Sequence, residues 1–116
     1  MIARTHRFHG YNALRFVYKQ GRTVKLPMCS LRYIENPKRD NYRLAIVVSK
    51  KQSKSAVVRN RIRRRLYEAG RELLPADRSV DMVITVFSNE MREMSRKDIN
   101  NIFSQILQIT AAGKGA

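Results

Sequence analysis

Residues 58–73 carry an apolar side chain at every third or fourth position, and this spacing constrains the fold more than any other feature of the chain. The stripe consists of Val58, Ile62, Leu66, Ala69 and Leu73. Side chains at this spacing lie on one face of an α-helix, so the segment predicts a helix whose apolar face is covered by another element. Ser53 or Ser55 is available as its N-cap, and Pro75 is expected to end it.

Two short apolar runs flank this predicted helix and are typical of buried strands. The run YRLAIVVS at 42–49 precedes the helix, and the run VDMVITVF at 80–87 follows it. Both are rich in β-branched residues and are too short for ordinary buried helices. We therefore expect a sheet against which the apolar face of the helix packs.

The N-terminal part of the chain predicts one further helix and one or two further strands. Residues 12–20 have helical apolar spacing, and Gly21 is a natural stop for that helix. Residues 23–34 mix apolar and polar side chains, which favours one or two strands, and Pro27 is expected at a sheet edge or a bulge.

A last helix is predicted near the C-terminal end. It opens at Ser95, three residues before Asp98, in a capping signature, and its apolar spacing continues to Leu107. We expect residues 1–10 and 111–116 to be flexible. The predicted fold is a single α+β domain, spanning 1–116, in which helices cover one sheet.

Positive charge is concentrated on the predicted basic helix and the loop before it. The chain has 24 Lys and Arg against 9 Asp and Glu, a net charge of +15. Between Lys50 and Arg71 there are nine basic residues and one acid, Glu68. A solvated helix face usually mixes opposite charges, because they relieve one another three or four residues apart. Here such mixing is almost absent, so the segment indicates a polyanionic partner, with nucleic acid favoured over an ordinary solvated face.

The segment SKKQSKSAVVRNRIRRRLYEAGREL at 49–73 resembles the signature segment of the bacterial ribonuclease P protein subunit. In that family a strand ending in a Ser-Lys-Lys type tripeptide leads into a helix that bears Arg-Asn-Arg. The resemblance extends to FVYKQGRTV at 16–24 and to the strand and helix at 80–109. It implies a two-layer α/β sandwich of α-β-β-β-α-β-α order with a left-handed β-α-β crossover.

The resemblance also implies a function in tRNA maturation. The protein would be a subunit of ribonuclease P, an endoribonuclease, in which the RNA subunit performs the Mg²⁺-dependent hydrolysis that removes the 5′ leader of precursor tRNA. No catalytic residue, bound metal or small-molecule substrate is expected on the protein. The positions that correspond to family contacts with the catalytic RNA are Lys50, Lys51, Lys54, Arg59, Asn60, Arg61, Arg63, Arg64 and Arg65.

The resemblance implies that the single-stranded leader of precursor tRNA lies in a cleft between the first helix and the sheet. The corresponding positions are Leu14 and Tyr18, which are four residues apart on that helix. Leu14 stands where the family commonly has an aromatic residue, so Tyr18 is expected to provide the base stacking. On spacing alone, core roles are favoured for both side chains, because an aromatic residue on a helix is more often part of the core than of a binding surface.

Two other classes of protein share some of these features. A ribosomal or other structural RNA-binding protein would have the basic helix but would need no leader cleft. A membrane-surface helix would need larger apolar anchors than this stripe offers. His6 and His9 have no carboxylate nearby in the sequence to orient them for catalysis, and Cys29 has no second cysteine to pair with. We expect a cytoplasmic protein.

Overall fold

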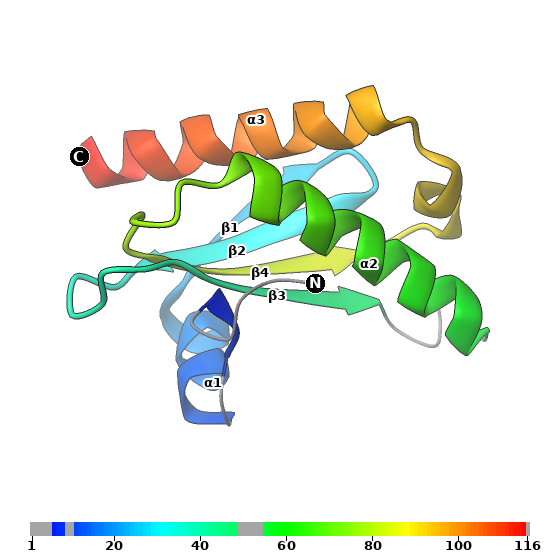
Figure 1. The fold of residues 1–116 in the computed structure, drawn as a ribbon. Helices are drawn as coiled ribbons and strands as arrows, with labels where there is room; N and C mark the ends of the chain where they lie inside the picture. Colours follow the sequence, from blue (N-terminus) through cyan, green and yellow to red (C-terminus); the bar gives the residue numbers. More distant parts are fainter. Residues whose placement is uncertain (1–5, 9–10, 49–54, 116) are drawn as a thin grey trace.

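The structure, a computed structural model, describes residues 6–8, 11–48 and 55–115. The elements follow in the order α1 (Tyr11–Gln20), β1 (Arg22–Leu26), β2 (Cys29–Glu35), β3 (Arg43–Val48), α2 (Ala56–Leu73), β4 (Val80–Val86), the 3₁₀ helix η2 (Asn89–Glu93) and α3 (Arg96–Gly115). This confirms the predicted α-β-β-β-α-β-α order and adds η2, which the sequence did not predict (Figure 1).

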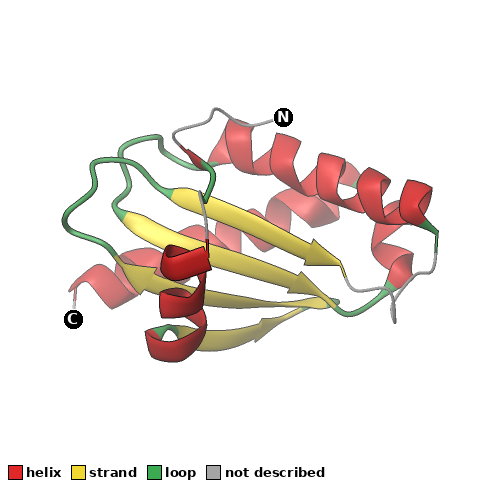
Figure 2. Ribbon diagram, turned by 90° about the horizontal axis from the view of Figure 1, so that it is seen from below, coloured by secondary structure: helices red, strands yellow, loops and turns green. Residues whose placement is uncertain are grey.

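The four strands form one mixed sheet in the order β1-β2-β4-β3. β2 pairs antiparallel with both β1 and β4, whereas β3 and β4 are parallel and are joined through α2. Seen from the α2 side with β3 running upward, the chain enters β4 to the left of β3 (Figures 1 and 2). The crossover is therefore left-handed, which is rare among β-α-β units and confirms what the family resemblance implied.

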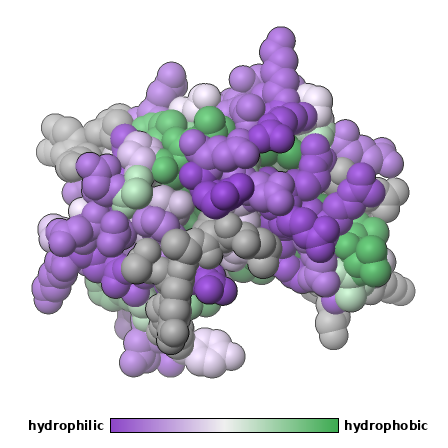
Figure 3. Space-filling model, in the orientation of Figure 1, coloured by the Kyte–Doolittle hydropathy of each residue, from purple (hydrophilic) through white to green (hydrophobic). Residues whose placement is uncertain are grey.

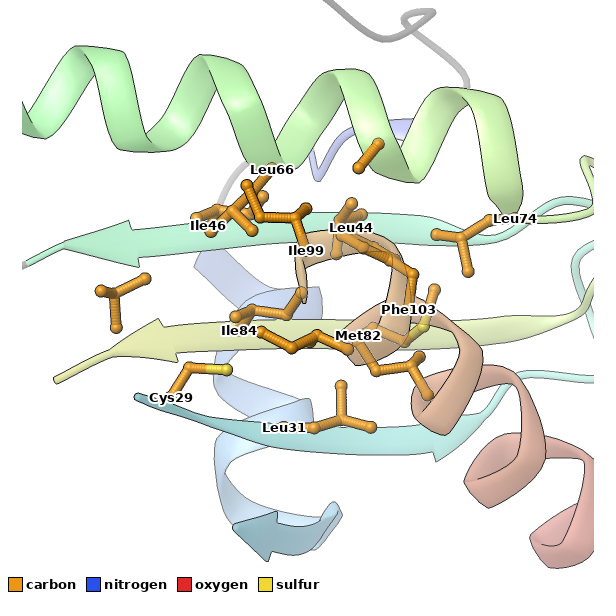
Figure 4. Packing of buried hydrophobic residues seen from close by; sticks show 14 of the residues in the cluster. Cys29, Leu31, Leu44, Ile46, Leu66, Leu74, Met82, Ile84, Ile99 and Phe103 are labelled. Atoms are coloured by element: carbon orange, nitrogen blue, oxygen red, sulfur yellow. The ribbon is translucent and has the colours of Figure 1, made fainter. Parts of the chain in front are cut away.

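The core lies between the sheet and the pair of helices α2 and α3, which cover the same face (Figure 1). Side chains of β2, β3 and β4 alternate in direction, so every second residue points into this layer. Figure 4 shows Leu31, Leu44 and Met82 from these three strands beneath Leu66 of α2 and Phe103 of α3. The apolar stripe of the basic helix is thus buried against the sheet, as the sequence predicted.

α1 lies on the opposite face of the sheet (Figure 2). Its Val17 is fully buried, whereas most of its other side chains are exposed or half-buried. α1 ends at Gln20, and the next position requires glycine, because a Cβ on Gly21 would come within 2.4 Å of the Val17 carbonyl oxygen, to which the Gly21 N–H donates. The sheet therefore has one fully covered face and one face that only a short helix crosses.

The ends of the two long helices follow the predicted capping. Ser55 is the N-cap of α2, since its hydroxyl accepts from the Val58 N–H, and the Ser95 hydroxyl accepts from the Asp98 N–H at the start of α3. The C-cap of α2 is Leu74, just before Pro75. α3 continues to Gly115, whereas the sequence predicted a frayed end beyond 110.

The turn between β1 and β2 contains the one described backbone position with positive φ outside glycine. Leu26 pairs with Cys29, so Pro27 and Met28 form a two-residue turn, and Met28 has a φ of 63°. Proline followed by a residue with positive φ is the signature of a type II turn. Pro27 is therefore in the turn, not in an edge strand or a bulge as the sequence predicted.

The described residues before α1 pack against the start of β3. The His6 ring stacks on the Tyr42 ring with centroids 3.9 Å apart, and His6 Nδ1 is 2.9 Å from the Tyr42 carbonyl oxygen. The Phe8 ring lies 5.0 Å from the guanidinium carbon of Arg43. His6 and Phe8 are thus tied to the sheet, although little structure was expected before residue 10. Within the described residues, no helix is both long and apolar enough to cross a membrane.

Candidate nucleic-acid interface

The first half of α2 presents guanidinium groups on the face that turns away from the sheet. Asn60, Arg61 and Arg64 are exposed, and Arg59 and Arg63 are half-buried. The apolar stripe occupies the opposite face, so these side chains cannot reach the core. Figure 3 shows hydrophilic side chains gathered over the α2 side of the molecule. This surface, which we call the arginine face, consists of Arg59, Asn60, Arg61, Arg63 and Arg64.

Three guanidinium groups of the arginine face keep their charge available within the part of the chain that the structure describes. Arg61, Arg63 and Arg64 form no ion pair with a carboxylate there. Arg63 donates from Nη2 to Asn60 Oδ1, one turn away. The Asn60 amide therefore orients a neighbouring guanidinium.

Arg65 differs from the other predicted RNA contacts. Its Nη1 donates to the Met91 carbonyl oxygen at 3.2 Å, and its Nη2 donates to the Met94 carbonyl oxygen. These carbonyls belong to η2 and the residue after it, so the guanidinium holds η2 against α2. Lys50, Lys51 and Lys54, the predicted contacts before α2, lie outside the described residues.

A cavity of about 420 Å³ lies where α1 approaches β3 and α2. Leu14, one of the two predicted leader contacts, lines it. The other lining residues are mostly aromatic or aliphatic: Arg7, Phe8, Tyr11, Leu44, Ala45 and Tyr67. The Tyr67 hydroxyl accepts from the Ile46 N–H at 3.2 Å and so satisfies a donor on the outer edge of β3.

Tyr18, the second predicted leader contact, does not line this cavity. Its side chain is 41 % exposed, and the guanidinium carbon of Arg32 lies 5.7 Å from the centre of its ring. Arg32 is held there because it donates to the Tyr18 carbonyl oxygen and, from Nε, to the Thr23 hydroxyl at 2.9 Å. The structure therefore separates Leu14 and Tyr18 into two adjoining places on the open face of the sheet.

Sequence reasoning missed several residues of this face. Phe8, Tyr11 and Tyr67 come together only through the fold, from the N-terminal segment, α1 and α2. Tyr11 could have been found, since it precedes Leu14 by three residues on one helix face. The approach of Arg32 to Tyr18 depends on the β1–β2 pairing register, which no local pattern specifies.

Chemically, the described residues of this surface offer groups suited to binding. No three His, Cys, Asp or Glu side chains among them lie close enough to hold a metal ion. Burial raises the pKa of the Cys29 thiol to about 11, so this cysteine is a neutral thiol at physiological pH. The arrangement is suited to an anionic chain with exposed bases, because it combines exposed guanidinium groups with exposed aromatic rings.

Comparison with known proteins gives one consistent result. The model of the family described as Ribonuclease P matches residues 2–111. The ribonuclease P protein component of Picosynechococcus is 32 % identical over 74 residues, which cover 64 % of this chain and 63 % of that protein. The match thus spans less than two thirds of that curated relative.

Two solved structures share the fold. The Staphylococcus aureus RNase P protein is 26 % identical with a TM-score of 0.74, and the match covers 90 % of this chain and 94 % of that one. The RNase P protein from Thermotoga maritima is 20 % identical with a TM-score of 0.72, covering 87 % and 94 %. At this lower identity the second likeness concerns the fold alone.

Proposed function

The chain belongs to the ribonuclease P protein family, and from this premise we propose that it is the protein subunit of ribonuclease P. As that subunit it binds the catalytic RNA and the 5′ leader of precursor tRNA, and it assists the removal of the leader by the RNA. It therefore forms part of an endoribonuclease without supplying the catalytic groups. We infer that it acts in the cytoplasm.

The arginine face carries this proposal. Like charges three and four residues apart on one helix repel by roughly 0.2–0.5 kcal/mol per pair. Arg61 and Arg64 form such a pair, both are exposed, and neither has a carboxylate partner among the described residues. A phosphate backbone turns this repulsion into attraction, and a planar guanidinium binds phosphate oxygens through two N–H groups at once.

The open face of the sheet supports the leader contact. Tyr18 offers an exposed ring next to the cationic Arg32, so a base can stack while its phosphate is neutralised nearby. The cavity at Leu14 adds apolar and aromatic walls one helical turn away. We infer that single-stranded RNA follows α1 along this face.

Mg²⁺ enters this proposal only as a cofactor of the RNA subunit. Among the described residues no three His, Cys, Asp or Glu side chains come together, and the proposal requires no site for Mg²⁺ on the protein itself. What the protein contributes is cationic charge close to the RNA, which reduces the phosphate repulsion that metal ions would otherwise have to offset.

Reconstitution with a bacterial catalytic RNA tests the proposal. Cleavage of precursor tRNA is measured at low Mg²⁺ with and without the protein, and the protein is expected to raise both the rate and the affinity for precursor tRNA. Tyr18→Ala should weaken precursor binding roughly 5- to 150-fold, the range for one stacked base, and should leave mature tRNA unaffected.

Tyr18→Phe is the matched control, since it keeps the ring and should bind precursor like the unchanged protein. A structural RNA-binding protein, the alternative function, would bind both tRNAs equally and would not accelerate cleavage. That result would contradict the assignment as a subunit of ribonuclease P.

A further inference from the structure

A second cavity, of about 330 Å³, lies on the other side of α1 from Tyr18 and Leu14. Its walls are Phe16 of α1, Ile34 and Glu35 at the end of β2, and Pro37 and Lys38 of the following turn. The buried Val17 lies between Phe16 and Tyr18 in the sequence and contacts the sheet, so the two rings leave α1 on opposite sides. This cavity is therefore separate from the proposed path of the leader.

The floor of the cavity is a fixed network of charged and polar side chains. Arg43 donates from Nε to Asp81 Oδ1 at 2.8 Å and from Nη2 to Asp81 Oδ2 at 2.6 Å. Asn36 donates from Nδ2 to Asp81 Oδ2 at 3.0 Å. Asp81 is almost fully buried, and the Phe8 ring lies over the Arg43 guanidinium. The charges of the floor are thus neutralised by one another.

The walls have the chemistry of a site for a nucleotide. The Phe16 side chain is 54 % exposed. Its ring can stack on one face of a planar base, and Pro37 faces the same cavity. Glu35 is exposed and accepts N–H donors, and the exposed Lys38 can bind a phosphate.

We propose that this cavity binds an unpaired guanine nucleotide of an RNA. The base stacks on Phe16, the adjacent N1–H and N2–H groups of guanine donate to the Glu35 carboxylate, and the phosphate pairs with Lys38. Adenine and uracil do not present two adjacent donors on that edge, so guanine is preferred. The same chemistry would admit a free guanine nucleotide, and the experiment separates these two sources. The inference extends the proposed function, since it adds a second RNA contact outside the leader path.

Binding to the full chain without the RNA subunit tests this site. Backbone amide shifts are recorded by NMR during titration with GMP, with CMP, and with RNA pentamers that have guanine or uracil at the central position. GMP and the guanine pentamer should shift the amides of Ile34, Glu35 and Lys38. The pentamer should bind at least tenfold more tightly than GMP, because its neighbouring phosphates meet a strongly basic protein. Tighter binding of GMP than of the pentamer would assign the site to a free nucleotide and overturn the RNA source.

Two substitutions and one control examine the contacts one by one. Phe16→Ala should lower the affinity for the guanine pentamer, measured from the shifts of these amides, roughly 5- to 150-fold, and Phe16→Tyr should restore that affinity. Glu35→Gln should reduce the preference for guanine over uracil without removing stacking. If Phe16→Ala leaves the shifts at Ile34 and Lys38 unchanged, or if guanine and uracil pentamers bind equally, the proposal is wrong.

This result is independent of the reconstitution assay. If the guanine pentamer does not bind at this cavity but the protein stimulates cleavage normally, only the guanine site is disproved. If guanine binds at this cavity but the protein does not stimulate cleavage, the role in ribonuclease P is disproved and the chain is an RNA-binding protein of another kind.

Discussion

At the scale of single residues, the buried Asp81 shows how this basic protein tolerates a carboxylate inside its sheet. Three donors from Arg43 and Asn36 satisfy its two oxygens. A buried ion pair contributes little net stability over an apolar replacement, but removal of one partner leaves an uncompensated charge. Removal of one partner should therefore lower the free energy of unfolding strongly, even though replacement of both partners by apolar side chains would lower it little.

Asp81→Ala is expected to lower the free energy of unfolding by about 3–5 kcal/mol, because Arg43 then stays buried without its carboxylate. Urea denaturation followed by circular dichroism measures the loss. Asp77→Ala is the control, since Asp77 is exposed and its removal should change stability by less than about 0.5 kcal/mol. Equal effects of the two substitutions would show that the ion pair is not a structural requirement.

Cys29 gives the stability a dependence on alkaline pH. Burial raises the pKa of its thiol from 9.0 to about 11 in the folded protein. Below pH 9 the thiol is neutral in both states, and between pH 9 and 11 only the unfolded chain loses the proton. The buried neutral thiol thus contributes roughly 3 kcal/mol to the free energy of unfolding. This contribution is fully present below pH 9 and is lost by about pH 11.

The measurement is urea denaturation at a series of pH values with the unchanged protein and with Cys29→Ala. The substitution lowers stability at neutral pH because it shortens a buried side chain, but the difference between the two proteins should shrink as the pH rises from 9 to 11. A constant difference across this range would contradict the buried, neutral thiol.

At the scale of the elements, α2 packs against the sheet with one face and presents arginine side chains on the other. On the face that packs, Gly70 lies at a close contact with β3 and α3. A Cβ at this position would lie 2.9 Å from Leu44 Cδ2 and 3.3 Å from Phe103 Cε1. Both neighbours are buried in the core, so neither moves freely. Gly70 thus allows α2 to approach β3 and α3 closely.

Gly70→Val is expected to destabilise the protein by roughly 1–3 kcal/mol through overpacking, even though glycine is itself a poor helix former. Thermal unfolding measures the effect. Ser104→Val places the same side chain on an exposed position of α3 and is the control, expected to change stability little. Equal shifts in Tm would mean that the space beside Gly70 is larger than the distances indicate.

The outer face of α2 determines how RNA binding responds to salt. Replacing Arg61 and Arg64 together by Ala should reduce the slope of log affinity against log salt concentration by about 0.7–0.9 for each phosphate that the protein no longer neutralises. Titration of the catalytic RNA at several KCl concentrations measures it, and Lys97→Ala, an exposed cation on α3, serves as the control for removal of a positive charge elsewhere. An unchanged slope in the double variant would mean that these guanidinium groups do not meet phosphates.

Element by element, much of the fold could be predicted from local patterns. The stripe from Val58 to Leu73 predicted the buried face of α2, and the apolar runs predicted β3 and β4, because alternation and spacing act within a few residues. The strand order and the crossover hand required the family resemblance or the structure, since they depend on contacts between distant segments. The family resemblance assigns Leu14 and Tyr18 to one cleft, but their surroundings come from β1, β2, β3 and α2 and could not be predicted from α1.

At the scale of the whole molecule, the net charge of +15 means that the folded chain repels itself. Raising the NaCl concentration tenfold is expected to raise the Tm by several degrees, because screening weakens the repulsion between exposed cations. A gain of about 1 kcal/mol in the free energy of unfolding corresponds to roughly 4–8 °C in Tm for a domain of this size. Differential scanning calorimetry measures the shift. An equal concentration of the neutral osmolyte glycerol is the control for effects other than screening, and a Tm independent of NaCl would contradict the repulsion.

The position of β4 in the sheet has a consequence for biosynthesis. β4 is the last of the strands in the described residues, yet it lies between β2 and β3, which do not pair with each other. A nascent polypeptide that has emerged only as far as α2 therefore holds two strands with no common neighbour. The sheet can close only after β4, which ends at Val86, has left the ribosome, so β3 cannot join β2 in one sheet while the emerged chain stops at α2.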